Sequence, residues 1–149
     1  MSQDFNQRIP YESVEAIIHA IKLSIKVACL ARVVSYNKNK HVADIVPLVT
    51  SSEGEVSAQL LDVPVSRNCY EFDEYLEKIK SDYRTLDNNP KISTSLLSSI
   101  PSKPAMKKGA VVLVVFMDKN HDNWEGSNNF KPNTTRLHSI NDAMIIGVM

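Results

Sequence analysis

The spacing of apolar residues changes along the chain, and each change predicts a different element. Over residues 11–26 the apolar and charged side chains separate onto two sides of a helical wheel. The apolar side is formed by Val14, Ile17, Ile18, Ile21 and Ile25. We expect an amphipathic helix over 11–26 that either packs on its own domain or docks on a partner, with Ile17 and Ile21 among the contact residues.

Three segments with strand character come next, separated by polar turns. They cover residues 27–36, 41–49 and 55–65, and the turns fall at 37–40 and 51–54. The first turn is rich in Asn, which tolerates positive φ and is typical of hairpins. Pro64 lacks an N–H for a ladder, so the third segment is expected to be an edge strand or to end there.

Helical spacing returns in an insertion over residues 68–104. Aromatic and aliphatic side chains share one side of a helix expected at about 70–83: Phe72, Tyr75, Leu76, Ile79 and Tyr83. The following stretch to residue 104 is rich in Asn, Ser and Pro, which predicts an exposed loop. Phe72, Tyr75 and Tyr83 are candidate contacts with a partner protein.

Two apolar runs near the C-terminal end, 110–117 and 144–149, are dominated by Val and Ile. β-Branched residues favour strands, and the first run, which is short and lies between a glycine and a polar turn, predicts a strand buried on both faces. Five strands with a helix between the third and fourth predict a mainly β protein with an OB-fold barrel. We therefore expect a single OB-fold domain over 1–149, with an N-terminal helix at 11–26 and the insertion at 68–104.

Composition narrows the classes of function. The chain has 149 residues, 43% hydrophobic and 23% charged, with a formal net charge of +0. It carries no global field to attract nucleic acid, and no apolar run approaches the roughly 20 residues of a membrane span, so no stable membrane insertion is expected. Many OB folds bind single-stranded nucleic acid with surface aromatics and a basic groove. A nucleic-acid-binding module therefore remains the alternative, although the basic group Lys103, Lys107 and Lys108 is small.

Residues that carry chemistry are few and poorly spaced. Two groups contain metal-binding residue types: His121 with Asp118 and Asp122, and His138 with Asp142. Neither has the spacing of a known metal motif. Ser139 lies next to His138 without the glycines of a nucleophile elbow. We expect no catalytic residues, no cofactor and no metal. Trp124, the only tryptophan, is expected to plug the barrel mouth or to lie in a contact between subunits.

Several segments then occur in a characteristic order: ARVVSYN at 31–37, VPL at 46–48, LDVPV at 61–65, KGAVVLVVF at 108–116, DNW at 122–124 and RLHSINDA at 136–143. The series resembles the N-terminal OB-fold domain of the central membrane-piercing spike of contractile-tailed bacteriophages. Its most specific residues are Asp122, Asn123, Trp124, Arg136, His138, Asp142 and Ala143.

The resemblance implies a non-enzymatic structural protein of a phage or prophage tail baseplate, made in the bacterial cytoplasm. It implies a homotrimer that attaches to tail hub and tube proteins and acts in envelope penetration or tail-tube plugging. In the family a β-helical needle follows the OB domain, whereas this sequence stops at Met149. The implied alternatives are a needle supplied by a separate chain, or a plug or adaptor that does not pierce. The insertion at 68–104 is a second departure from the family pattern.

Overall fold

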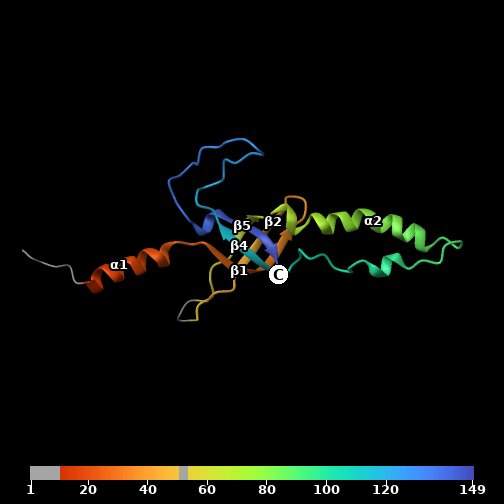
Figure 1. The fold of residues 1–149 in the computed structure, drawn as a ribbon, viewed down its shortest axis with the longest axis horizontal. Coiled ribbons are helices and arrows are strands. Elements are labelled where there is room, and N and C mark those ends of the chain that lie inside the picture. Colours follow the sequence, from red (N-terminus) through yellow and green to blue (C-terminus); the bar gives the residue numbers. More distant parts are fainter. Residues whose placement is uncertain (1–10, 51–53) are drawn as a thin grey trace, which may run out of the picture.

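The computed structural model describes residues 11–50 and 54–149, and its centre is one curled antiparallel sheet of five strands (Figure 1). The strand order is β3-β2-β1-β4-β5. The strands are β1 Ala28–Asn37, β2 Val42–Pro47, β3 Leu60–Pro64, β4 Val111–Phe116 and β5 Ala143–Val148. The prediction of a mainly β chain with five strands and two helices is therefore confirmed at this level.

The third strand is shorter than predicted. It begins at Leu60 and not at residue 55, while Val56 forms only an isolated bridge with Thr50. The predicted turn at 51–54 lies mostly outside the described residues. Pro64 ends β3, as its missing N–H predicts.

The sheet curls until its two outer strands meet. Register shifts interrupt the β1–β2 pairing between Val33 and Ser35 and the β4–β5 pairing between Leu113 and Val114. Such irregularities bend strands and increase their twist. Just beyond β3, a parallel bridge joins Val65 to Ile145 of β5, and the Ser66 amide donates to the Ile145 carbonyl at 2.8 Å. The result is a half-barrel with its edges in contact at one end.

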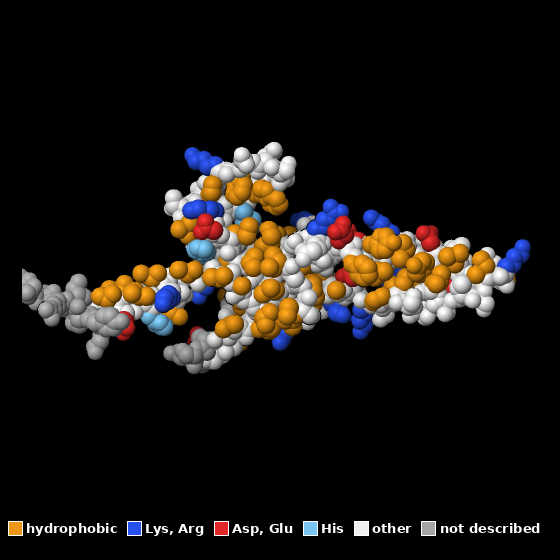
Figure 2. Space-filling view, viewed as in Figure 1, with side chains coloured by type: hydrophobic (Ala, Val, Ile, Leu, Met, Phe, Trp, Pro, Cys, Tyr) orange, Lys and Arg blue, Asp and Glu red, His pale blue; other side chains and the backbone are white. Residues whose placement is uncertain are grey.

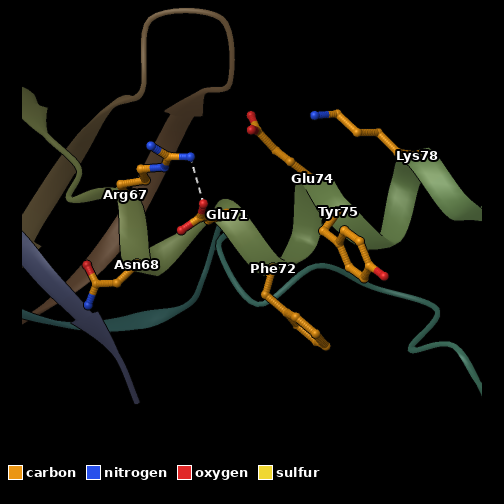
Figure 3. Close-up of a pocket in the computed structure, with 7 residues that line it drawn as sticks. All are labelled: Arg67, Asn68, Glu71, Phe72, Glu74, Tyr75 and Lys78. Atoms are coloured by element: carbon orange, nitrogen blue, oxygen red, sulfur yellow. Dashed lines mark ion pairs between the residues drawn. The ribbon is translucent and has the colours of Figure 1, made fainter.

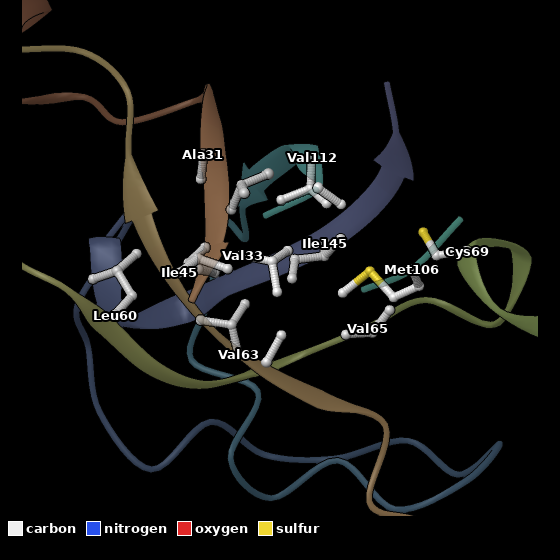
Figure 4. Close-up of a cluster of buried hydrophobic side chains, with 14 residues drawn as sticks. Ala31, Val33, Ile45, Leu60, Val63, Val65, Cys69, Met106, Val112 and Ile145 are labelled. Atoms are coloured by element: carbon white, nitrogen blue, oxygen red, sulfur yellow. The ribbon is translucent and has the colours of Figure 1, made fainter. Parts of the chain in front are cut away.

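Alternate residues of the strands fill the interior of this half-barrel (Figure 4). In β4, Val112 and Val114 are fully buried, whereas the neighbouring Val111 and Leu113 are half-buried. The prediction that the strand at 110–117 is buried on both faces is therefore wrong. A curled sheet has a closed inner face and a more open outer one, so period-two burial appears even in an unbroken apolar run.

The two helices project from opposite sides of the sheet (Figure 1). Helix α1 covers Tyr11–Ser24 and helix α2 covers Glu71–Asp87, four residues beyond the predicted end. After α2 the chain returns along the helix through the short 3-10 helix η2, Leu96–Ser99. Within the described residues, neither helix is long and apolar enough to cross a membrane.

Candidate functional site

An ion-paired cluster ties the long loop between β4 and β5 to the sheet. Arg136 donates from Nε to Asp142 Oδ2 at 2.8 Å and from Nη2 to Asp142 Oδ1 at 2.6 Å. The Asp142 side chain is completely buried, while that of Arg136 is 34% exposed. A bidentate pair of this kind fixes orientation as well as charge. The sequence places these residues in one segment, and the structure brings them into contact.

The backbone around Asp142 explains its position. The short 3-10 helix η3, Ile140–Asp142, leads directly into β5. The Ser139 hydroxyl accepts from the Asn141 amide at 3.2 Å, and the Met117 amide at the end of β4 donates to the Asp142 carbonyl at 2.8 Å. Asp142 is therefore held at the base of the loop, where its carboxylate meets Arg136.

Asp122 extends the cluster from the opposite side of the loop. Its Oδ2 lies 3.7 Å from Arg136 Nη2 and accepts a hydrogen bond at 2.6 Å from Asn120 Nδ2. Asn120 is fully buried, so its amide needs a partner inside the protein. Three members of the predicted motif set, Asp122, Arg136 and Asp142, thus converge although 20 residues separate the first from the last.

The electrostatics of this cluster favour permanent charge. Hydrogen bonds from Arg136 hold the pKa of the Asp142 carboxyl below its ordinary value and outweigh the opposing effect of burial. The same contact raises the pKa of Arg136 further. An ionised carboxylate locked to a guanidinium exchanges no proton near neutral pH, so the arrangement suits a structural tie and not acid–base catalysis.

The outer part of the loop is closed by amides, and Trp124 stays exposed. Asn133 Nδ2 donates to Asn123 Oδ1 at 2.7 Å, Asn123 Nδ2 donates to Asn133 Oδ1 in return, and it also donates to the Lys131 carbonyl at 3.1 Å. Trp124 is 52% exposed and lies outside the hydrophobic core. The alternative that it plugs the barrel mouth is therefore wrong, because a plugging side chain is buried. A contact between subunits remains a prediction.

The two histidine groups that contain metal-binding residue types lie in different surroundings. His138 lies 3.2 Å from Asp118, from Nε2 to Oδ1, whereas Asp142 is taken by Arg136. Within residues 11–50 and 54–149, no three His, Cys, Asp or Glu side chains gather closely enough to hold a metal ion. Ala143, the last motif residue, is buried where β5 pairs with Phe116 of β4.

The residues expected to contact partners lie on the two projecting helices. On α1, Ile17 and Ile21 are 59% and 54% exposed; on α2, Phe72 and Tyr75 are likewise mostly exposed, while Tyr83 is half-buried. Phe72 and Tyr75 line a shallow hollow near the start of α2 (Figure 3). Charged side chains share that hollow, including the Arg67–Glu71 ion pair at 2.7 Å, so it does not have the apolar enclosure of a small-molecule site.

Sequence reasoning missed the carboxylates that hold α2 to the segment 88–106, which returns along it; we call these two segments together the α2 hairpin. Asp73 accepts from the Ala105 and Met106 amides, each at 3.1 Å. Asp87 accepts from the Leu96 and Leu97 amides, each at 2.8 Å, and its pKa is lowered chiefly by the Leu97 N–H. These contacts join residues far apart in sequence, and no local spacing marks them.

A second set of unforeseen contacts fixes the start of α2 against the β1–β2 turn. The rings of His41 and Tyr70 stack with centroids 3.8 Å apart, and Lys38 forms an ion pair with Glu77. The Tyr36 hydroxyl lies 3.4 Å from His41 Nδ1. Burial, together with the negative charge of Glu74, raises the pKa of Tyr36 to about 12. The hairpin is thus oriented by the sheet at its root.

Neither a scan against protein-family models nor a search of curated proteins finds a match to this chain.

Proposed function

We propose that the chain is a non-enzymatic structural component of a phage or prophage tail baseplate. In this role it is an OB-fold spike or hub protein at the tail tip, acting as a homotrimer in envelope penetration or tail-tube plugging. Its partners are other copies of itself, tail hub and tube proteins and, where a needle is present, a separate needle chain. It is made in the bacterial cytoplasm and ends in the virion tail.

The arrangement of the strands supports the OB-fold part of the proposal. Strand β1 pairs with both β2 and β4, and the extension of β3 meets β5 through the parallel Val65–Ile145 bridge. An OB fold is a five-stranded, partly open barrel, and a helix precedes its fourth strand here.

The observation that carries the proposal is the convergence of the two most specific motif segments. Asp122 comes from the Asp-Asn-Trp segment, while Arg136 and Asp142 come from the second segment, and all three meet in one ion-paired cluster. The motif residues therefore include side chains that are in direct contact, and this supports the proposal.

The cluster also suits a load-bearing role. A part that transmits axial force from a contracting sheath needs a stiff sheet and loops that do not shear from it. The backbone hydrogen bonds between strands stiffen the sheet. The doubly hydrogen-bonded Arg136–Asp142 pair holds the loop to the sheet. No step in this function makes or breaks a covalent bond.

Light scattering coupled to gel filtration tests the proposal together with an oligonucleotide titration. We expect a stable assembly of three chains that does not bind single-stranded DNA. A single chain that binds oligonucleotides with salt-sensitive affinity would contradict the proposal and support the nucleic-acid alternative. The genes beside the coding sequence give an independent test, since we expect tail-tube, sheath or baseplate reading frames there.

A further inference from the structure

Helix α1 exposes an apolar stripe along its length (Figure 2). Residues 13–24 of the helix are all exposed, and so are residues 25–27 that join it to β1. The large apolar side chains of the stripe within the helix are 41–59% exposed: Val14, Ile17, Ile18 and Ile21. Ile25 and Val27, in the segment that follows the helix, are 44% and 66% exposed. An uncovered row of isoleucines on a projecting helix is costly in water and marks an interaction surface.

The spacing within the stripe is that of a helical bundle. Val14, Ile18 and Ile21 follow one another at intervals of four and three residues within the helix, and Ile25, one residue past its end, follows at four. This is the alternation of d and a positions in a heptad repeat, in which knobs of one helix enter holes of another. Leu23 falls on the opposite side of the helix, at an f position.

The residue types at these positions favour more than two helices. β-Branched residues occupy both the a and the d positions, and isoleucine at both shifts the preference from dimers to trimers or tetramers. Ile17, at a g position, widens the apolar face beyond a narrow two-stranded seam. The stripe therefore fits the interior of a small bundle and not the seam of a pair.

We propose that the α1 helices of three copies of this chain pack in parallel as a three-helix bundle about a threefold axis. This inference rests on the proposed function, which supplies the number of three copies. It adds that the copies contact one another through the apolar stripe of α1. Helices packed along a threefold axis must all run in the same direction. An antiparallel pair would instead place Glu15 beside Lys22 of the second copy, and this is the rival arrangement that the test must separate.

The bundle continues into the half-barrels at its C-terminal end. An apolar groove lies where α1 joins the sheet, lined by Ile25, Val27, Pro47, Val49, Phe116 and Ile140 among others. Ile25 and Val27 belong both to this groove and to the end of the apolar stripe. The covered surface in the trimer thus runs from α1 onto the adjoining end of each sheet, with Lys26 and Ser57 as polar members of the groove.

Two matched substitutions test the bundle in the full chain. Ile21→Lys places an ammonium group at the bundle axis, whereas Leu23→Lys places it on the outside. The two side chains are similarly exposed in the single chain, 54% and 62%, so neither change disturbs the core of the sheet. We expect Ile21→Lys to reduce the light-scattering mass from three chains to one, with the circular dichroism of the sheet retained, and Leu23→Lys to leave three chains.

The outcomes separate this inference from the proposed function. A parent chain of three copies that Ile21→Lys leaves intact would overturn the bundle but not the homotrimer. A parent chain that is a single copy or a pair would overturn both. Orientation is read from Val14→Cys, which we expect to form a disulfide between copies on oxidation much faster than Leu23→Cys, with the unchanged parent as background for Cys29 and Cys69. Equal rates for the two variants would contradict the parallel arrangement.

Discussion

The sheet and helix α1 use the same residue types in opposite ways. In the sheet, Val33, Val112 and Ile145 are at most 1% exposed. Val33 and Val112 lie on strands with a neighbouring strand on each side, and Ile145 lies between β4 and the bridge to Val65. In α1, Ile17 and Ile21 have more than half of their surface in water. Valine and isoleucine therefore form a core within one chain in the first region, and in the second they remain exposed on the surface of that chain.

The difference shows that a hydrophobic pattern specifies which face is buried but not by what. A strand finds its partners among neighbouring strands of the same chain, because the ladder and the turns bring them together. A short projecting helix has no such constraint, and isolated helices of this length are marginal in water. We infer that the sheet is stable on its own and that α1 gains its stability on assembly.

The largest expected effect contrasts the same substitution in the two regions. Ile145→Ala removes methyl groups from a fully buried site and should lower the free energy of unfolding by about 3 kcal/mol. Ile21→Ala on α1 should change it by no more than about 0.5 kcal/mol, when both are measured by urea denaturation in solutions dilute enough to contain single chains. Similar losses at the two sites would remove the distinction between the regions.

A second prediction concerns the tie between loop and sheet. Asp142→Asn replaces a buried carboxylate and leaves Arg136 without its charged partner, which should cost about 2–3 kcal/mol of stability, less than for a fully buried pair because Arg136 is partly exposed. Asp118→Asn is the matched control, since that carboxylate is 63% exposed beside His138 and its removal should change stability little. Thermal melts of both variants and the parent measure the contrast.

The same pair predicts a pH dependence. The folded-state pKa of Asp142 lies below its ordinary value of 3.8, so the unfolded chain takes up this proton at higher pH than the folded one. The stabilisation is complete above that ordinary pKa and is lost as pH falls through the lowered folded value. Asp44 and Asp87 also have lowered pKa values and act in the same direction. We expect Asp142→Asn to reduce, but not abolish, the loss of stability in acid; an unchanged acid slope would contradict the assigned cause.

The local sequence pattern was sufficient to locate the helices and strands, but it did not predict the curvature of the sheet or the contacts between its elements. Runs of β-branched residues located β4 and β5, and helical spacing located α1 and α2, because both signals depend on neighbours in sequence. The one-sided burial of β4 and the early end of the 55–65 strand depend on curvature and edge pairing, which periodicity does not contain.

The candidate site divides in the same way. The motif residues Arg136 and Asp142 were identified in sequence as members of one segment, but their mutual contact needed the η3 turn. His138 was weighed together with Asp142 as a group of metal-binding residue types, but it lies beside Asp118, because Arg136 already pairs with the Asp142 carboxylate. The roles of Asp73 and Asp87 could not be predicted from the sequence, because their partners are backbone amides, which every residue except proline carries.

A smaller effect is expected at the far end of the α2 hairpin. Asp87→Ala removes the acceptor for the Leu96 and Leu97 amides, so we expect hydrogen exchange of these amides to accelerate about fivefold or more. The midpoint of global unfolding should hardly move, because this segment lies far from the core of the sheet. A large fall in the melting temperature would show that the hairpin and sheet unfold as one unit.

Hydrogen exchange of α1 at two protein concentrations tests the central claim most directly. We predict that the amides of Tyr11–Ser24 exchange quickly in dilute solution and become protected at high concentration, while the amides of β4 and β5 are protected equally in both. Protection of α1 that is already complete in single chains, or that stays absent when three chains are assembled, would contradict the account.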